Sequence, residues 1–283
     1  MALLIGDIGG TSSRWAVVSG SRRGLLPVKI PGFNPVTGDP GSMQAALANQ
    51  EMTDAIGGHV RQVVAYGAGC GTRTRSEVLR RALAHVWPQA IIGVESDLLG
   101  AARGLYGRGQ GLVLILGTGM NAGHFDGTYL HTPMPSLGYI LGDEGSGADI
   151  GKHLLRDALY GLVPPAVHDR LFPQGPDLPA VINATYRSTS PQAYVASFTA
   201  ALSDHLDNTY VHDLIASRFF ALARLLPKYF APHELEQVRA SGSVANAFQQ
   251  ILGQVLAQQG MDLTAVASDP LPGLLEFHGG SAL

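Results

Sequence analysis

A glycine-rich segment near the N-terminus has the residue types that bind phosphate and a divalent cation. The apolar run Ala2–Ile5 leads into Gly6-Asp7-Ile8-Gly9-Gly10-Thr11, and a second apolar run, Trp15–Val18, follows, which predicts a strand, a tight turn and a strand. Adjacent glycines let backbone N–H groups approach a bulky anion. A carboxylate at the strand end, Asp7, can hold a cation directly or through its water shell. The segment favours a nucleotide polyphosphate with magnesium, with an ordinary Asp-Gly hairpin as the alternative. It is no Walker A loop, because no Gly-Lys-Ser/Thr follows.

A second turn of the same kind occurs in the other half of the chain. Gly111–Leu116 is a predicted strand, Gly117-Thr118-Gly119 a turn, and the next strand runs to the hairpin turn at Asp126-Gly127. Both halves thus follow the plan strand, Gly/Thr turn, strand, hairpin, strand, although the two copies share little sequence identity. Two facing turns of this kind could clamp a polyphosphate from both sides.

Asp97 has the position of a general base. The predicted strand Ala90–Val94 ends just before it, and a helix begins near it. Open α/β sheets bind ligands at the carboxyl ends of their strands, which favours a catalytic carboxylate here. The alternative is a helix N-cap, a favourable use of Asp. Glu95 could compete for either role, but it falls earlier in the strand.

Three further segments contain candidate binding residues, each with a structural alternative. Asn34 is either a contact to a substrate hydroxyl or a turn former whose side chain bonds its own backbone. The pair Asp143-Glu144 lies among glycines that suit a tight loop under a ligand, or it forms a loop favoured by the dipole of the following helix. The turn Ser241–Ala245 joins a strand to a helix, which suits a nucleotide platform but also plain packing of helix on strand.

The composition excludes several classes of protein. A chain of 283 residues has two domains as a soft prior, and 46% hydrophobic residues supply a sizeable core. The net charge of −3 gives no basic patch for nucleic acid. No run approaches the roughly 20 apolar residues of a membrane span, and the N-terminus lacks a signal-peptide pattern. The single cysteine, Cys70, excludes a disulfide framework and is expected to be a buried filler. We expect a soluble cytoplasmic α/β protein with no membrane or nucleic-acid partner.

The order of these segments resembles the superfamily of acetate and sugar kinases, actin and heat-shock chaperones. More narrowly, nearly the whole chain resembles the N-acetylglucosamine kinases of the BadF/BadG/BcrA/BcrD ATPase family. The matching motifs are DIGGT (Asp7–Thr11), ESDLLGA (Glu95–Ala101), LGTGMNAG (Leu116–Gly123), LGYILGDEGSGADIGK (Leu137–Lys152) and SGSVANAF (Ser241–Phe248). The most specific part is GTGxN followed by GDEGSG.

The resemblance implies an α/β fold of two ribonuclease-H-like, actin-like ATPase domains around a nucleotide and sugar cleft. The first domain is expected over residues 1–107 and the second, with a helical insertion, over 108–283. Related kinases are often dimers, so the resemblance also implies a homodimer.

The implied activity is ATP-dependent phosphorylation of the 6-hydroxyl of N-acetylglucosamine. By motif, Asp97 is the base that takes the hydroxyl proton and Asp7 faces Mg²⁺. The implied nucleotide-binding residues are Gly9, Gly10, Thr11, Gly117, Thr118, Gly119, Gly242, Ser243 and Val244. The implied sugar-binding residues are Asn34, Gly119, Asn121 and Asp143.

Three positions depart from the family pattern. Ser12 stands where the branch often has Lys, with Arg14 as the candidate replacement for a phosphate contact. Ser96 stands where Asn often precedes the base, which leaves the base's supporting contact open. Met120 replaces the Ser of GTGSN and is expected to narrow or reshape the sugar pocket.

Other functions remain open from the sequence. The sugar could be glucosamine, N-acetylmuramic acid or glucose. The reductase-activating ATPases of the same family bind an iron–sulfur cluster through cysteines, and Cys70 lies in the wrong context for that. The repressor and kinase group of bacterial glucokinases has a cysteine-rich zinc motif that is absent here. A non-catalytic sugar or nucleotide sensor is supported by the missing Lys at Ser12 alone.

Overall fold

The chain folds into two compact α/β units. The computed structural model describes residues 2–20, 22–36, 38–188 and 190–279. The first unit groups the described residues within 1–110, 125–130 and 269–283, and the second those within 111–124 and 131–268. The structure therefore assigns residues 269–279 to the first unit, whereas the sequence-based division at 107/108 placed them in the second domain. No helix in the described part of the chain is long and apolar enough to cross a bilayer.

The sheet of the first unit has the order β3-β2-β1-β5-β6, with β4 paired to β2. β1 pairs antiparallel with β2 and parallel with β5, and β5 pairs parallel with β6. The parallel strands therefore end at the same edge of the sheet. The strands are β1 (Ala2–Ile8), β2 (Ser12–Ser19), β3 (Arg22–Leu25), β4 (Ile30–Pro31), β5 (Val60–Gly67) and β6 (Ile91–Ser96).

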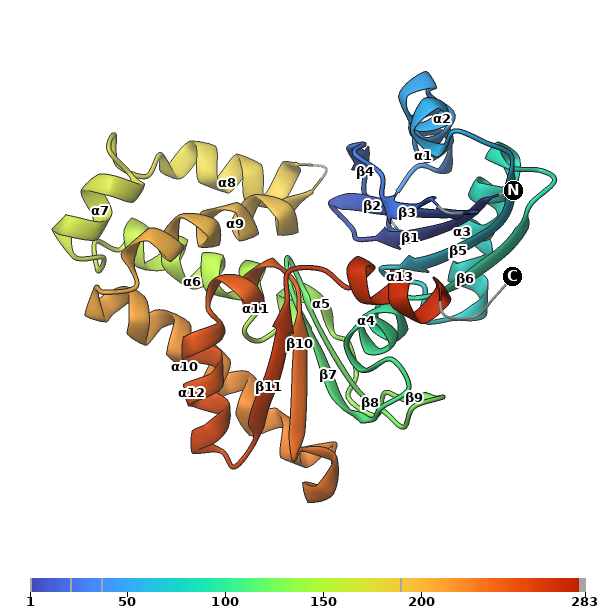
Figure 1. Cartoon of the computed structure of the whole chain (residues 1–283). Helices are drawn as coiled ribbons and strands as arrows, with labels where there is room; N and C mark the ends of the chain where they lie inside the picture. Colours follow the sequence, from blue (N-terminus) through green and yellow to red (C-terminus); the bar gives the residue numbers. More distant parts are fainter. Residues whose placement is uncertain (1, 21, 37, 189, 280–283) are drawn as a thin grey trace. The chain divides into compact units, whose positions relative to one another are not determined.

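Helices cover both faces of this sheet (Figure 1). The helices are α1 (Pro40–Leu47), α2 (Gln50–Ile56), α3 (Arg73–Val86), α4 (Asp97–Tyr106) and α13 (Leu271–Gly279). Successive residues of β1 point to opposite faces, so Leu4 packs in the core under α1, α2 and α3, while Leu3 and Ile5 pack in the core with α13. Each face of the first sheet is therefore buried.

The C-terminal helix α13 is an integral part of the first unit, which explains the difference from the sequence-based division. Leu271 and Leu274 are fully buried in the core that contains β1. The Tyr66 hydroxyl is 2.9 Å from His278 Nε2, and Arg103 of α4 donates to the same hydroxyl at 3.1 Å. These contacts fix α13 against α4 and β5.

The sheet of the second unit has the order β11-β10-β7-β8-β9. Written from β9 to β11, this order is β9-β8-β7-β10-β11, which matches β3-β2-β1-β5-β6 of the first unit. The central strand β7 thus takes the place of β1. The strands are β7 (Gly111–Leu116), β8 (Met120–Phe125), β9 (Leu130–His131), β10 (Gln237–Ser241) and β11 (Asp262–Ala267). β7, β10 and β11 run parallel, so their carboxyl ends also share one edge.

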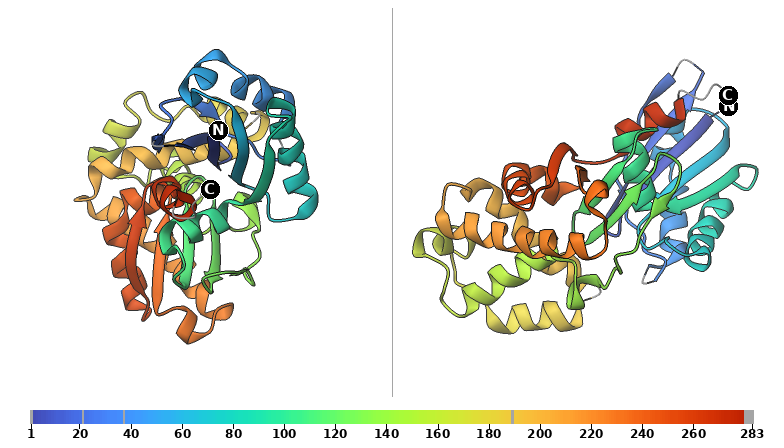
Figure 2. Two further views of the ribbon diagram at one scale, coloured as in Figure 1. Left: turned by 45° about the vertical axis from the view of Figure 1, so that its right-hand side comes forward. Right: turned by 90° about the horizontal axis from the view of Figure 1, so that it is seen from below.

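Long helices pack around this second sheet. Figure 2 shows α10 alongside α12, and α12 packs on β11. The stretch between α6 and α10 is helical, in agreement with the expected insertion in this half. The helices are α5 (Gly138–Leu141), α6 (Gly147–Leu159), α7 (Pro165–Leu171), α8 (Leu178–Arg187), α9 (Pro191–Ala200), α10 (Thr209–Leu225), α11 (Ser243–Ala247) and α12 (Gln249–Gln258).

Candidate functional site

The predicted phosphate turn of the first unit connects β1 to β2. The Gly9 N–H closes the turn onto the Ser12 carbonyl at 3.0 Å. A second segment supports it, because the Phe33 N–H donates to the Gly9 carbonyl at 3.0 Å and the Gly32 N–H donates to the Thr11 carbonyl at 3.1 Å. A Cβ on Gly32 would lie 2.4 Å from the Gly9 oxygen, so this close approach requires glycine. The last three residues of the turn are exposed, as a ligand-binding turn requires.

Asn34 follows directly after this supporting segment. Its Oδ1 accepts the Val36 N–H at 2.9 Å, and its carbonyl accepts the Gly38 N–H at 2.7 Å. A Cβ on Gly69 would lie 3.0 Å from the same Oδ1, so Asn34 borders the end of β5. The turn-forming alternative is therefore observed, and the sugar contact of Asn34 stays a prediction.

Two predicted carboxylates lie at the edge where β1, β5 and β6 end. Asp7 is the penultimate residue of β1, and Asp97 follows the last residue of β6. Burial and, to a smaller extent, the negative charges of Asp97 and Asp269 raise the pKa of Asp7 to about 7, and Arg14 opposes this shift. The three carboxyl groups therefore share one electrostatic environment within the first unit.

Asp97 is the first residue of α4 rather than its cap. Ser96 occupies the N-cap position, where its Oγ accepts the Leu99 N–H at 3.2 Å, so the interpretation of Asp97 as the N-cap is wrong. Asp97 Oδ1 accepts the Leu98 N–H at 2.8 Å. Burial raises the pKa of Asp97 to about 6, although this N–H opposes the shift. A carboxyl group with that pKa is largely ionised near neutral pH and can still accept a proton.

Cys70 lies close to Asp97 and has the properties of a buried filler. Its thiol is buried, and burial together with the charge of Asp97 raises the pKa of Cys70 to about 12. A thiol with that pKa stays protonated at neutral pH and is a poor nucleophile.

Asp269 is a charged neighbour that the sequence did not single out. It forms an ion pair with Arg14, and its Oδ1 accepts the Leu271 N–H at 3.0 Å at the start of α13. Arg14 stands opposite Asp7 in the β1–β2 register, and its side chain is half exposed. An exposed guanidinium thus lies beside the predicted cation ligand.

The residues of the first unit fit a magnesium ion that arrives with a nucleotide. Among the described residues, no group of three or more His, Cys, Asp or Glu side chains could hold a metal ion. Mg²⁺ in nucleotide sites typically takes one or two carboxylates, and phosphate oxygens and waters complete its shell. Asp7 suits that role, because burial and the charges of Asp97 and Asp269 raise its pKa, and a bound cation would compensate the negative charge.

The matching turn of the second unit, Gly117–Gly119, is held by the start of α6. The Gly117 N–H donates to the Gly119 carbonyl at 3.0 Å. The N–H groups of Gly147 and Ala148 donate to the carbonyls of Gly117 and Thr118 at 2.8 and 3.1 Å. The turn is therefore fixed by backbone hydrogen bonds from the first turn of a helix.

The predicted adenosine segment packs directly on this turn. Gly242 has φ 116° and ψ 165°, a conformation that is essentially restricted to glycine. A Cβ on Gly242 would lie 2.4 Å from the Leu116 oxygen, and Val244 Cγ2 lies 3.4 Å from the Cβ position of Gly147. Ser243, the first residue of α11, is exposed. The structure thus brings together the nucleotide-binding residues that the resemblance implied for the second unit.

Asp143 lies beside the same turn, in an unusual backbone conformation. It is the one non-glycine residue with positive φ, at 61°, among the described residues. Its Oδ2 accepts the Gln192 Nε2–H at 3.2 Å, and its carboxyl group accepts the Met120 N–H. A Cβ on Gly119 would lie 2.9 Å from Oδ2. Burial raises the pKa of Asp143 to about 6.

The adjacent β8 residues Met120 and Asn121 differ in the burial of their side chains. Asn121 is half-buried, and its Oδ1 accepts the Ala122 N–H at 3.0 Å. The Met120 side chain lies in the hydrophobic core of the second unit. The expectation that Met120 narrows or reshapes a sugar pocket is therefore not supported, because its side chain packs in the core and its backbone N–H serves Asp143.

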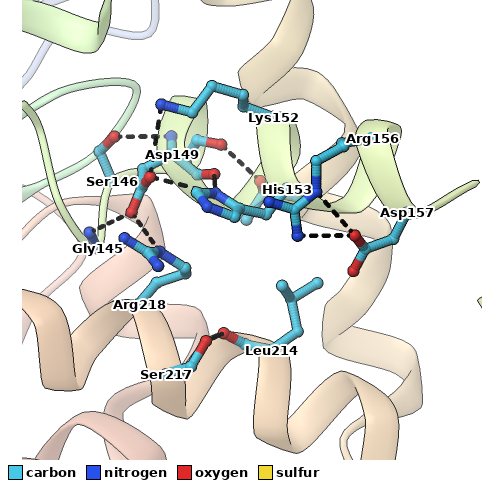
Figure 3. Close-up of polar contacts among 12 residues, drawn as sticks. Gly145, Ser146, Asp149, Lys152, His153, Arg156, Asp157, Leu214, Ser217 and Arg218 are labelled. Atoms are coloured by element: carbon cyan, nitrogen blue, oxygen red, sulfur yellow. Dashed lines mark hydrogen bonds and ion pairs between the residues drawn. The ribbon is translucent and has the colours of Figure 1, made fainter. Parts of the chain in front are cut away.

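A second buried aspartate, Asp149, lies in the first turn of α6 (Figure 3). Its Oδ2 accepts hydrogen bonds from Arg218 Nε at 2.8 Å and from the Gly145 N–H at 3.0 Å. Burial would raise the pKa of Asp149, but hydrogen bonds from His153 and Arg218 hold it at about 2. Asp149 is therefore a permanent negative charge next to the turn formed by residues 143–146, which we call the Asp143 turn.

Comparison with known proteins identifies the group to which the chain belongs. No family model and no curated protein matches it. Among solved structures, a candidate N-acetylglucosamine kinase from Porphyromonas gingivalis is 33% identical, with a TM-score of 0.88 and coverage of 99% of this chain and 100% of that one. The chain belongs to the sugar kinases. The actin-like, two-part α/β fold predicted for it is confirmed by the same match.

More distant structures share the fold of this sugar kinase. A candidate N-acetylglucosamine kinase from Chromobacterium violaceum is 21% identical, covers 98% of each chain and has a TM-score of 0.67. A ROK family glucokinase from Streptomyces griseus, solved with glucose and AMPPNP, is 17% identical, covers 98% of each chain and has a TM-score of 0.61. At these identities the matches show the fold alone.

Within each unit of the sugar kinase, the predicted residues gather at one place. The sequence missed four residues around the predicted ones. Gln192 bonds Asp143, and Asp269 pairs with Arg14. Asp149 bonds the Gly145 N–H, and Arg218 holds Asp149. Asp149 lies within the recognised GDEGSGAD stretch and could have been singled out as an acid in the first turn of a helix. No local sequence signal pointed to Gln192 or Arg218. Gln192 of α9 lies 49 residues after its partner Asp143, and Arg218 of α10 lies 69 residues after its partner Asp149.

Proposed function

We propose that the protein is an ATP-dependent kinase that phosphorylates the 6-hydroxyl of N-acetylglucosamine. The observation that carries the proposal is Asp97, a partly buried carboxyl group just after the end of β6 whose pKa is raised to about 6. Among the described residues, no side chain is hydrogen-bonded to it, so its oxygens are available to a substrate hydroxyl. The choice of sugar rests on the 33% identity with the candidate N-acetylglucosamine kinase. It agrees with the narrower resemblance to the BadF/BadG branch.

In the proposed reaction, Asp97 accepts the proton of the 6-hydroxyl as its oxygen bonds to the γ-phosphorus of ATP, while the bond from that phosphorus to the bridging oxygen breaks and ADP leaves. General base catalysis of this kind contributes about 10²–10⁴-fold to the rate. Gly9, Gly10 and Thr11, in the turn after Asp7, approach the transferred phosphoryl group. Arg14, half exposed and beside Asp7, is the cation that replaces the family's Lys.

The second unit supplies the other binding groups of the proposal. Gly117, Thr118 and Gly119 contact the remaining phosphates, and Gly242, Ser243 and Val244 border the adenosine. Asn121 and Asp143, with Asn34 of the first unit, hold sugar hydroxyls. Magnesium bound with the nucleotide through Asp7 would neutralise charge on the phosphate oxygens. The remaining acceleration comes from alignment of the two substrates.

The test is coupled ATP-to-ADP turnover with magnesium against a panel of sugars. The panel contains N-acetylglucosamine, glucosamine, N-acetylmannosamine, N-acetylmuramic acid and glucose. Stimulation by N-acetylglucosamine alone, abolished in Asp97→Asn, is the expected result. Stimulation by another sugar would keep the mechanism and overturn the specificity. ATP binding without stimulation by any sugar would overturn the kinase activity in favour of a sensor.

Two further parts of the proposal concern the state of the protein. The family resemblance implies a homodimer, and the composition of the chain favours a location in the cytoplasm. Light scattering of the purified protein tests the dimer, and a monomer at micromolar concentration would overturn it.

A further inference from the structure

The carboxylate of Asp149 is the centre of a buried charge cluster in the second unit (Figure 3). Its side chain is 3% exposed, and three cationic or ionisable side chains surround it. Arg218 Nε lies 2.8 Å from Oδ2, His153 Nδ1 3.3 Å from Oδ1, and Lys152 Nζ 3.7 Å from Oδ1. The remaining contact is to the backbone, where Oδ2 accepts the Gly145 N–H at 3.0 Å.

The backbone contact stabilises a turn that is unfavourable on its own. Asp143 has φ 61° and Gly145 φ 77°, so the turn contains two left-handed residues. The left-handed conformation brings a Cβ too close to the backbone, and Asp143 carries one. The turn is closed by the Ser146 N–H, which donates to the Asp143 carbonyl at 3.0 Å. A hydrogen bond to an ionised carboxylate is stronger than one between neutral groups, so Asp149 is a strong anchor for this turn.

The conformation of the turn decides where the Asp143 carboxylate lies. Asp143 Oδ2 is within 3.2 Å of Gln192 Nε2 and within 2.9 Å of the Cβ position of Gly119. A relaxation of the turn toward ordinary backbone angles would move Oδ2 away from these neighbours. The position of Asp143 therefore depends on the anchor at Gly145.

We propose that Asp149, fixed by Arg218, is a positioning residue that aims Asp143 at the acceptor sugar. The inference rests on the proposed function, in which Asp143 holds a sugar hydroxyl. Its effect falls on the sugar rather than on the nucleotide. The Gly117–Gly119 turn is held by backbone N–H groups of Gly147 and Ala148, which do not need the Asp149 carboxylate.

The helix that carries Asp149 also offers a matched control. Asp157 is a second buried aspartate of α6, 8% exposed, and it binds Arg156 Nη2 at 2.8 Å and the Tyr210 hydroxyl at 3.0 Å. Among the described residues, its side chain makes no hydrogen bond or ion pair with the Asp143 turn, and Figure 3 shows it further along the helix. Asp157→Asn therefore removes a buried charge from the same helix without touching the turn.

The experiment measures the affinity for N-acetylglucosamine by calorimetry in the wild type, Asp149→Asn and Asp157→Asn, together with sugar and ATP KM values. We expect Asp149→Asn to weaken sugar binding roughly 10- to 100-fold, the loss typical of a hydrogen bond to a charged group. Its ATP KM should stay within about twofold of the wild type, because the nucleotide turn keeps its backbone hydrogen bonds. Asp157→Asn should lower the melting temperature comparably and leave sugar affinity unchanged.

Two further readouts separate positioning from general damage. Arg218→Lys, which keeps the positive charge, should retain more sugar affinity than Arg218→Met. Amide hydrogen exchange over residues 143–149 should accelerate in Asp149→Asn and not in Asp157→Asn.

Equal sugar affinities in Asp149→Asn and Asp157→Asn would overturn the inference. Sugar binding to the wild type without any turnover would overturn only the kinase activity, because affinity still tests the positioning role. A wild-type protein that binds no sugar would overturn both.

Discussion

The two units share one strand order but differ in what stands at the end of their central strand. In the first unit, Asp7 precedes the turn, and its pKa is raised to about 7 by burial and by neighbouring carboxylates. In the second unit, residues 111–123 contain no acidic side chain, and the turn is held by backbone N–H groups of α6. The acid of that unit, Asp143, comes from a separate loop with a left-handed backbone.

A close glycine contact supports the turn in both units. Gly32 approaches the Gly9 oxygen in the first unit, and Gly242 approaches the Leu116 oxygen in the second, each with a Cβ position 2.4 Å from that oxygen. The shared topology therefore provides a tightly supported turn twice, and the residues beside it determine its chemistry. In the proposed reaction, the first unit supplies ionisable groups and the second supplies backbone donors and a sugar-binding acid.

The first prediction has the largest expected effect and tests whether the first unit supplies the base of the proposed reaction. Asp97→Asn should lower kcat by about 10²–10⁴-fold while sugar affinity stays near that of the wild type, because an amide cannot accept the proton. In the wild type, kcat/KM should fall as the pH falls through about 6, because protonation of Asp97 removes the base. Coupled ATP turnover across a range of pH measures both effects.

The neighbouring acid of β6 provides the control for this variant. Glu95 is exposed and lies two residues before Asp97, so Glu95→Gln should keep wild-type kcat and its pH dependence. Full activity of Asp97→Asn would move the base elsewhere and end the assignment of proton transfer to the first unit.

The second prediction tests whether the backbone conformation at Gly242 in the second unit is needed to bind the nucleotide. Gly242→Ala should raise the ATP KM and destabilise the protein by about 1–3 kcal/mol, the cost of a residue with a Cβ in a glycine-only conformation. The added methyl group would also displace the Leu116–Gly117 peptide, which lies 2.4 to 3.2 Å from the Cβ position. Nucleotide titration and thermal unfolding measure the two effects.

A helical glycine of the same unit is the matched control. A Cβ on Gly253 of α12 would meet only Leu263 Cδ2 at 3.7 Å, an ordinary contact. Gly253→Ala should therefore stabilise the protein by roughly 0.5–1 kcal/mol and leave the ATP KM unchanged. An unchanged ATP KM in Gly242→Ala would remove this segment from the nucleotide site.

The sequence predicted those parts of both units whose signal is local. Glycine turns after apolar runs predicted the connections at Gly9–Ser12 and Gly117–Gly119, and the repeated plan anticipated the repeated strand order. Asp97 was found because it lies where a predicted strand ends and a helix begins. Its competing role as N-cap was wrong, since the hydroxyl of Ser96 already accepts the helical N–H.

The parts that the sequence could not predict depend on contacts between distant segments. Asp269 reaches Arg14 across 255 residues, because α13 returns to the sheet that begins the chain. Periodicity locates such a helix but does not say which sheet covers its apolar face. The left-handed backbone of Asp143 was equally hidden, because it is stabilised by Asp149 and Ser146 and is unfavourable for the Asp residue itself.

The smallest expected effect concerns the stability cost of charge in the first unit. Asp7 has a pKa of about 7 in the folded protein against 3.8 for an unperturbed aspartate, so between these pH values the folded state holds more protons than the unfolded state. The free energy of unfolding therefore decreases as the pH rises through this window. Asp7→Asn removes this term, so its melting temperature should exceed that of the wild type by a few degrees at about pH 8 and match it near pH 4.

Thermal unfolding at several pH values measures this difference, with Asp262→Asn as the control. Asp262 is an exposed aspartate at the start of β11 in the second unit, so its removal should leave the pH dependence of the wild type intact. Magnesium with a nucleotide should raise the melting temperature of the wild type at about pH 8 more than that of Asp7→Asn, because a bound cation offsets the same charge. Identical pH profiles for the wild type and Asp7→Asn would mean that burial and the neighbouring carboxylates do not raise the pKa of Asp7 in the folded protein. Asp97 would then be the remaining evidence that the first unit acts through ionisable side chains, whereas the second acts through backbone N–H groups.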